Sequence, residues 1–337
     1  FNVVLGVDFD EPALRTFEAN HGSAKALKLD LFNHDNIFEI KKYLEDNKIQ
    51  LDVLVGGPPC QGFSLAGKRE ENDERNVLYS AMVKTAKELK PKIVVLENVP
   101  GMLKLYDVKG AKRIINDFTE LGYKMSAEIL YAPNFGVPQI RKRVVFVGIL
   151  NGKKEFEYPT PKIKPEDYIT CEEAISDLPS LENDNDYSLD KIREYIMKPT
   201  NDYQKQMRKN SIKVFNHFPT KHAQKTIENI AKIPDGGNYK DLPVGESEKF
   251  KYHESLTRYN SKKPSLTIDT GHRTHFHYKY NRIPSVRENA RLQSFPDDFI
   301  FYGSKQQQYK QVGNAVPALL GKAVAEKSKE VLDKDEV

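Results

Sequence analysis

Residues 51–64 read LDVLVGGPPCQGFS. The apolar run Leu51–Val55 predicts a short buried strand, and the Gly/Pro loop that follows places Cys60 beyond the strand end. A lone cysteine is more often a small buried hydrophobe, but a loop with a restricted backbone exposes its residues at the edge of a sheet. A reactive cysteine needs a polar, partly open site near cationic groups, because the thiolate is its reactive form. The stretch therefore predicts a reactive Cys60 at a sheet edge.

Outward from this stretch, apolar runs alternate with amphipathic segments through the first 150 residues. The alternation predicts an α/β fold, with a parallel sheet covered by helices on both sides. Strands are expected at 2–8, 26–30, 51–55, 93–96, 125–131 and 143–150, and helices from Asp10 and over 36–46, 75–89 and 111–121. Ligands bind such sheets at the carboxyl ends of the strands. Polar or reactive groups stand at or just after four of these ends, namely Asp8, Asp30, Cys60 and Glu97.

Two further motifs carry charged groups at this edge. Glu97 ends the apolar run 94–96, where either a salt bridge or a catalytic acid fits, and its proximity to the strand that leads to Cys60 favours a shared substrate. In the segment 139–143, Gln-Ile-Arg-Lys-Arg, alternation points Arg141 and Arg143 the same way. That arrangement suits an anionic or carbonyl-bearing partner. A solvated basic edge is the simpler alternative for the two arginines.

Composition sets broad limits on the class of protein. The chain has 337 residues, of which 39% are hydrophobic and 30% charged, as in globular proteins rather than disordered ones. No apolar run approaches the ~18 residues of a membrane span, and the N-terminus does not resemble a signal peptide. The two cysteines, Cys60 and Cys171, imply no disulfide framework and a reducing compartment, so a cytoplasmic location is expected. The net charge of +4 gives only weak support for a nucleic-acid partner.

The pattern changes after about residue 153. Prolines at 159, 161 and 165 resemble a linker, and a capping box (Thr170, Glu173) begins a helix. Residues 180–285 lack α/β alternation and are rich in Asn, Lys, Tyr and His. A second capping box (Ser285, Glu288) restores regular structure, and a last helix is expected over 317–332. We therefore expect a catalytic domain over 1–160, a separate irregular module over 161–284, and a C-terminal part over 285–337 that returns to the first domain.

Together these segments resemble the C5-cytosine DNA methyltransferase family. The motifs are Pro58-Pro-Cys-Gln61, Glu97-Asn-Val99, Gln139-x-Arg-x-Arg143, Arg287-Glu-x-x-Arg-Leu-Gln-x-Phe-Pro296 and Gly313-Asn-x-Val-Pro317. Five motifs in the family's order leave little room for chance. The resemblance covers residues 1–150 and about 257–325, and the part between corresponds to the target-recognition region. It implies a Rossmann-like S-adenosylmethionine-dependent methyltransferase domain with a smaller, irregular target-recognition domain.

The resemblance also implies the site. The catalytic residues would be Cys60, Glu97, Arg141 and Arg143. S-adenosylmethionine, which leaves as S-adenosylhomocysteine, would contact Asp8, Phe9, Asp30, Leu31, Pro59, Leu78, Asn314 and Val316. No metal is expected. The family's Phe-x-Gly-x-Gly-Gly motif, which comes before the Asp8 strand, is absent from this sequence, so we expect it in residues that precede Phe1, or in a second polypeptide.

The resemblance further implies the partner, double-stranded DNA with a specific cytosine-containing site and a flipped-out target base. Basic and imidazole groups of the module suit phosphate, base-edge or groove contacts, namely Arg258, Lys262, Lys263, Arg273, Arg282, His272, His275 and His277. Ordinary surface charge is the alternative for most of the lysines, and a zinc site is a minor alternative for the histidines. We expect a bacterial or phage modification enzyme, monomeric on DNA, with a cognate restriction endonuclease but no stable complex. The alternatives are a tRNA cytosine-5 methyltransferase and a non-catalytic DNA-binding relative.

Overall fold

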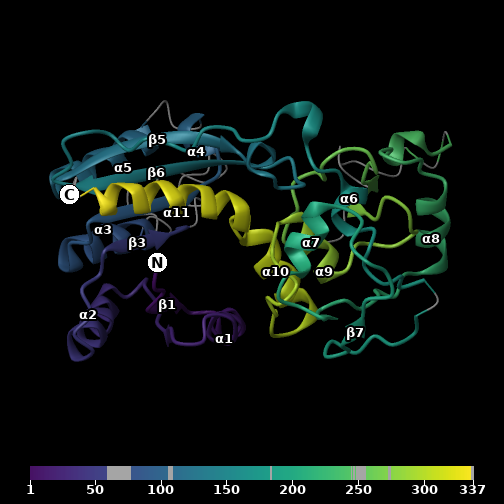
Figure 1. The fold of residues 1–337 in the computed structure, drawn as a ribbon, viewed down its shortest axis with the longest axis horizontal. Coiled ribbons are helices and arrows are strands. Elements are labelled where there is room, and N and C mark those ends of the chain that lie inside the picture. The colour runs from purple at the N-terminus through teal and green to yellow at the C-terminus, as the bar shows by residue number, and fades with distance from the viewer. Residues whose placement is uncertain are drawn as a thin grey trace.

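A computed structural model describes residues 1–58, 77–104, 109–182, 184–243, 245, 247, 256–271 and 275–334. Figure 1 shows a sheet with helices on its faces beside a second, mostly irregular part. The first part contains β1 (Leu5–Asp8), α1 (Glu11–Asn20), β2 (Lys25–Lys28), α2 (Ile37–Asp46), β3 (Val53–Gly56), α3 (Val77–Leu89), β4 (Ile93–Asn98), α4 (Gly101–Lys104), α5 (Lys109–Glu120), β5 (Tyr123–Tyr131) and β6 (Lys142–Leu150). The α/β fold expected from the sequence is confirmed.

The main sheet is mixed, with the strand order β3-β4-β6-β5. Strands β3 and β4 run parallel, whereas β6 runs antiparallel to both of its neighbours. The expectation of an all-parallel sheet was therefore wrong. Strand β6 runs antiparallel to β5 because the connection between Tyr131 and Lys142 is short, and a parallel connection needs a crossover of a dozen or more residues. Strands β1 and β2 form a parallel pair of their own, and within the described residues neither belongs to the sheet of β3.

Alternation along the strands gives the sheet two apolar faces. Val94 and Leu96 of β4 point to the face covered by α3, α4 and α5. Ile93 and Val95 point to the other face, where Leu320 of α11 (Ala318–Asp333) packs against them. Figure 1 shows α11 running back along the sheet from the boundary with the second part. Because both faces are covered, access to the sheet is left at its strand ends, where the motifs lie.

The second part contains α6 (Cys171–Ile175), β7 (Arg193–Glu194), α7 (Asp202–Arg208), β8 (Lys213–Val214), α8 (Gln224–Ala231), β9 (Thr257–Arg258), β10 (His275–Phe276), α9 (Val286–Leu292) and α10 (Lys305–Asn314). We call residues 161–284 the recognition module. Its core contains buried residues of α6 and α7 together with Val286 and Val312, so α9 and α10 pack with the recognition module. Among the described residues of the C-terminal part, α11 and Val316 just before it pack on the sheet. The expected domain boundaries stay a prediction. The packing adds that the recognition module shares one core with α9 and α10.

The two capping boxes are confirmed. Thr170 Oγ1 accepts the backbone N–H of Glu173, whose carboxylate accepts the N–H of Thr170 in return. Ser285 and Glu288 make the same reciprocal pair at the start of α9. Each box provides partners for N–H groups that a helix start otherwise leaves unbonded. The sequence therefore located both helix starts correctly.

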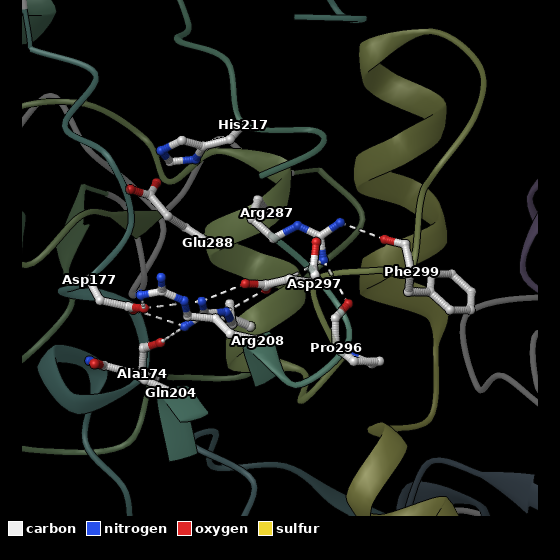
Figure 2. A network of polar contacts seen from close by, with 12 residues as sticks. Ala174, Asp177, Gln204, Arg208, His217, Arg287, Glu288, Pro296, Asp297 and Phe299 are labelled. Atoms are coloured by element: carbon white, nitrogen blue, oxygen red, sulfur yellow. Dashed lines mark hydrogen bonds and ion pairs between the residues drawn. The ribbon is translucent and has the colours of Figure 1, made fainter. Parts of the chain in front are cut away.

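A buried ionic network joins α6 and α7 to α9 and the turn after it. Arg291 Nε lies 2.5 Å from Asp297 Oδ1, and its Nη1 lies 3.0 Å from Asp177 Oδ1. Arg208 of α7 also reaches Asp177, at 3.1 Å. In Figure 2, dashed lines join the carboxylates of Asp177 and Asp297 to guanidinium groups, and Arg287 donates to the carbonyls of Pro296 and Phe299. Since Arg291, Asp177 and Asp297 have no exposed side-chain surface, the arginine motif of α9 is part of the core.

Candidate active site

Glu97 and Arg143 form an ion pair at the carboxyl edge of the main sheet. Glu97 is near the end of β4 and Arg143 near the start of β6, and the register pairs Glu97 with Val145. The diagonal neighbour Arg143 therefore lies on the same face, and its Nε is 2.6 Å from Glu97 Oε1. The side chains are 12% exposed for Arg143 and 17% for Glu97, which leaves both accessible to a substrate. The salt bridge that was the simpler alternative for Glu97 is thus present, at the place expected for a catalytic acid.

Burial raises the pKa of the Glu97 carboxyl, and the nearby charges of Arg143 and Arg141 oppose this effect without cancelling it. A raised pKa keeps the protonated form of a carboxyl available at higher pH than usual. Such a group can donate a proton or a hydrogen bond to a substrate atom that gains negative charge. The environment of Glu97 therefore suits a general acid.

Arg141 differs from Arg143 because it is committed to the protein interior. It is 1% exposed, and its Nη2 donates to the carbonyl oxygens of Gly313 (2.8 Å) and Ala315 (3.1 Å). Its Nη1 donates to the carbonyl of Ile268 at 3.1 Å. Burial lowers the pKa of Arg141 to about 9, and the charge of Arg143 adds to this effect. Arg141, one residue before β6, therefore connects this edge of the sheet to the recognition module and to the Gly313-Asn-x-Val-Pro segment.

The chain that leads to Cys60 begins beside this pair. A Cβ built on Gly57 would stand 3.3 Å from Glu97 Oε2, and the Asn98 side-chain amide donates to the carbonyl of Pro58 at 2.9 Å. Cys60 and Pro59 themselves lie outside the described residues, so their expected roles stay predictions. Asn98 was not singled out from the sequence. Its signals in the sequence were its place in the Glu97-Asn-Val99 motif and its polar side chain at the end of an apolar strand, and Asn98 is 6% exposed.

The residues expected at the cofactor lie at neighbouring strand ends. Asp8 ends β1 and pairs with Lys28 of the parallel strand β2, so Asp8 and Asp30 come at the same edge. Asp8 Oδ1 accepts the N–H of Asp10, Asp30 Oδ1 accepts the N–H of Phe32, and both side chains are exposed. Phe9 is 59% exposed. Exposed carboxylates beside an exposed ring fit hydroxyl, amino and aromatic groups of a nucleoside.

The remaining positions expected at the cofactor lie in α3, at the end of α10 and in two loop segments. Leu31 and Leu78 are half-buried, the latter in the first turn of α3. Asn314 ends α10 and is exposed, and Val316 packs at the edge of the core under α11. Lys310 Nζ of α10 lies 3.4 Å from Asp10 Oδ2, which connects α10 to the start of α1. The C-terminal end of α10 is therefore joined to Arg141, and Lys310 in the same helix is joined to Asp10 after β1.

Several groups expected to face DNA are buried instead. Arg258 is 5% exposed and donates to the carbonyls of Ile233 and Ile230, and Arg282 is 6% exposed and paired with Glu288 at 2.7 Å. His275 and His277 are 6% and 2% exposed. The expectation of DNA contacts was wrong for these four residues, because the module has few regular elements and uses long polar side chains to bind its own carbonyl groups.

The other residues expected to contact DNA, and the alternative of a zinc site, have different outcomes. Lys262 and Lys263 are exposed, while His272 and Arg273 lie outside the described residues. Within the part of the chain that the structure describes, no group of three His, Cys, Asp or Glu side chains could hold a metal ion. No helix in the described ranges is both long and apolar enough to span a membrane.

Comparisons with known proteins place this geometry in a family. The family model for C-5 cytosine-specific DNA methylases matches residues 1–330. The type II methyltransferase M.DdeI of Desulfomicrobium norvegicum is 35% identical over 352 residues, covering 97% of this chain and 83% of the relative. M1.HphI of Haemophilus parahaemolyticus, another type II methyltransferase, is 36% identical over 331 residues, covering 97% of this chain and 80% of the relative.

Solved structures show the same fold. A chain described as a prophage-encoded DNA modification methyltransferase of E. coli has a TM-score of 0.77 and 23% identity, covering 99% of this chain and 93% of that one. The Dnmt2 methyltransferase of S. pombe has a TM-score of 0.57 and 16% identity, covering 99% and 92%. The family model and the relatives show that the chain belongs to the C-5 cytosine-specific DNA methylases.

Proposed function

We propose that this methyltransferase moves a methyl group from S-adenosylmethionine to C5 of a flipped-out cytosine in a specific duplex DNA site. The observation that carries the proposal is the Glu97–Arg143 pair at the sheet edge, beside the Gly57–Pro58 segment that leads to Cys60. An acid, a cation and a cysteine along one edge are the groups that activation of a pyrimidine ring requires.

Cys60 acts as the nucleophile. Its thiolate attacks C6 of the cytosine, and the electron pair of the C5–C6 double bond shifts toward C5 and N3. Glu97, which burial keeps protonated to a higher pH, donates its proton or a hydrogen bond to N3. The C5 carbon then takes the methyl group. The methyl donor leaves as S-adenosylhomocysteine. Loss of the C5 proton to a base, with breakage of the C–S bond, restores the double bond and the thiolate, and any proton taken up by N3 returns to Glu97.

The two arginines have different roles in this proposal. Arg143, which is partly exposed, holds the O2 side of the ring and favours the Cys60 thiolate by its charge. Arg141 holds the backbone around the site through three carbonyl groups and acts on the substrate through its field rather than by contact. The resemblance had placed both arginines among the catalytic residues, and in this proposal Arg141 has a positioning role instead.

S-adenosylmethionine supplies the electrophilic methyl group. The exposed carboxylates of Asp8 and Asp30 fit its ribose hydroxyls and adenine amine, and Phe9 offers a ring face for the adenine. The half-buried Leu31, Leu78 and Val316 and the exposed Asn314 complete the set that the chain contributes, together with Pro59. Placement at strand ends agrees with where α/β sheets bind ligands.

The recognition module reads the DNA site, and the target cytosine leaves the duplex because its C5 and C6 atoms are not accessible inside the base stack. We propose a modification enzyme of a restriction–modification system, acting as a monomer on DNA in the cytoplasm and forming no stable complex with its endonuclease. The type II names of the relatives support this role.

The test is transfer of labelled methyl from S-adenosylmethionine to duplex DNA by the full-length protein. Cys60→Ala should abolish transfer, whereas Cys171→Ala should retain it, because Cys171 is buried in the module core. Mapping the label should give 5-methylcytosine at one site. Transfer to tRNA and not to duplex DNA, or equal activity of the two cysteine variants, would contradict the proposal.

A further inference from the structure

A pocket of about 640 Å³ opens at the carboxyl edge of the main sheet, next to the catalytic pair. It is lined by Pro100, Gly101, Ile129, Tyr131, Ile140 and Lys142. These residues follow β4, end β5 and begin β6, the same strand ends that carry Glu97 and Arg143. The function proposed above assigns no role to this pocket.

The pocket and the catalytic pair lie on opposite faces of the same edge. Lys142 and Arg143 are consecutive in β6, so their side chains point to opposite faces. Tyr131 is the cross-strand partner of Lys142 and shares its face. The pocket and the pair are thus separated only by the edge of the sheet, and Lys142 and Arg143 are adjacent in the chain.

The lining suits a nucleotide. Ile129 and Ile140 are each 38% exposed, and the Lys142 ammonium lies 5.5 Å from the centre of the Tyr131 ring. Tyr168 packs edge-on against Tyr131 at 6.0 Å and fixes the ring. Lys142 is exposed and none of the lining residues is acidic, so the pocket has the charge that complements a phosphate. Aromatic and aliphatic surface beside it complements a base or sugar.

The pocket also adjoins the recognition module. The backbone N–H of Ile140 donates to the carbonyl of Ser265 at 2.7 Å, and Thr267 Oγ1 donates to the carbonyl of Ile140. The module segment 265–267 therefore continues the same rim, and Leu266 on it is 36% exposed. A DNA duplex that binds between the two parts of the molecule needs a continuous surface of this kind.

We propose that this pocket holds one nucleotide that flanks the target cytosine, with Lys142 on its phosphate and Tyr131 against its base or sugar. The inference rests on the proposed function, since it takes duplex DNA as the partner. Phosphate contacts fix the position of a protein on DNA without reading sequence. Lys142 therefore contributes affinity for any duplex and sets the register of the target base at Glu97.

The test compares Lys142→Gln with Lys124→Gln, an exposed lysine near the other end of β5. Affinity for duplex DNA is measured by fluorescence anisotropy over a range of salt concentrations. Lys142→Gln should weaken binding several-fold on all sequences and reduce the salt slope by about 1, as for one lost phosphate contact. Lys124→Gln should match the wild type. Equal affinities and salt slopes of the two variants would overturn the inference.

A second measurement locates the contact. Single phosphates around the site mapped by methyl transfer are replaced by neutral methylphosphonates. One neutral phosphate adjacent to the target should weaken wild-type binding and leave the Lys142→Gln variant unaffected, since the pair is already broken. Additive losses at every position would refute the contact. Wild-type protein that fails to methylate DNA would instead refute the proposed function, so the two failures are distinguishable.

Discussion

The Asn98 side chain holds the carbonyl of Pro58 at 2.9 Å, which ties the end of β4 to the chain two residues before Cys60. Asn98 Oδ1 also accepts the backbone N–H of Val99 at 2.9 Å, so the amide group is fixed at both ends. The side chain is 6% exposed. This one residue therefore ties the end of β4 to the segment that leads to Cys60, the proposed nucleophile.

Asn98→Asp should lower kcat more than it lowers stability. The substitution keeps the shape and the acceptor but removes the donor to Pro58, and loss of such a buried hydrogen bond costs about 1–3 kcal/mol in stability. Misplacement of a catalytic group by ~1 Å can cost about 100-fold in rate. Steady-state methylation and urea unfolding measure the two effects. A kcat equal to that of the wild type would show that Asn98 does not position the Cys60 loop.

Glu97→Gln should remove a pH dependence as well as activity. Burial raises the pKa of folded Glu97 above that of the unfolded chain, so the native state binds this proton more tightly. Its contribution to stability is present below the ordinary Glu pKa and is lost as pH rises through the raised one. As pH rises through this range, the free energy of unfolding of the Glu97→Gln variant should therefore increase relative to that of the wild type.

The rate should fall by about 10²–10⁴ in the same Glu97→Gln variant, the usual contribution of a general acid. Urea unfolding at several pH values and single-turnover methylation measure the two quantities. A stability difference that stays constant with pH would show that the Glu97 pKa is not raised. Unchanged methylation would remove Glu97 from the mechanism.

Arg291→Met should destabilise the protein severely. The substitution leaves the carboxylates of Asp177 and Asp297 buried with fewer partners, and breaking a buried ion pair costs about 3–5 kcal/mol. The matched control is Lys205→Met, which removes an exposed ion pair with Asp202 on α7 and should cost at most about 1 kcal/mol. Denaturant unfolding compares them, and similar midpoints would show that the network contributes no net stability.

Gly313→Ala and Gly321→Ala should change stability in opposite directions. A Cβ at Gly313 would stand 2.4 Å from the carbonyl oxygen of Asp269, a backbone atom that cannot yield easily, so a loss of about 1–3 kcal/mol is expected. Gly321 lies inside α11, where a Cβ would stand 4.0 Å from Val316 Cγ1, and alanine there should add about 0.5–1 kcal/mol. Thermal unfolding measures both changes. Gly313→Ala should also weaken S-adenosylmethionine binding, because Asn314 follows it.

Local patterns in the sequence were sufficient for most elements of the first 150 residues, for two capped helix starts and for the motifs. The apolar run 93–96 predicted β4, and the residue pairs Thr170/Glu173 and Ser285/Glu288 predicted helix starts that the structure confirms. Such features depend on residues a few positions apart, so a single sequence contains them. The same is true of Glu97, which alternation placed at a strand end.

Only the tertiary structure decided which charged groups face a substrate. Arg141 and Arg143 alternate identically in the sequence, yet Arg141 binds carbonyls of Ile268, Gly313 and Ala315 while Arg143 stays beside Glu97. Arg258 and His277 are likewise enclosed by the module. The carbonyl partners of a buried guanidinium come from segments distant in the chain, and the alternation of side chains along a strand does not predict them. The sequence by itself determined the strands of the first 150 residues and two capped helix starts, whereas long-range packing determined which polar groups are enclosed and which stay partly exposed at the edge.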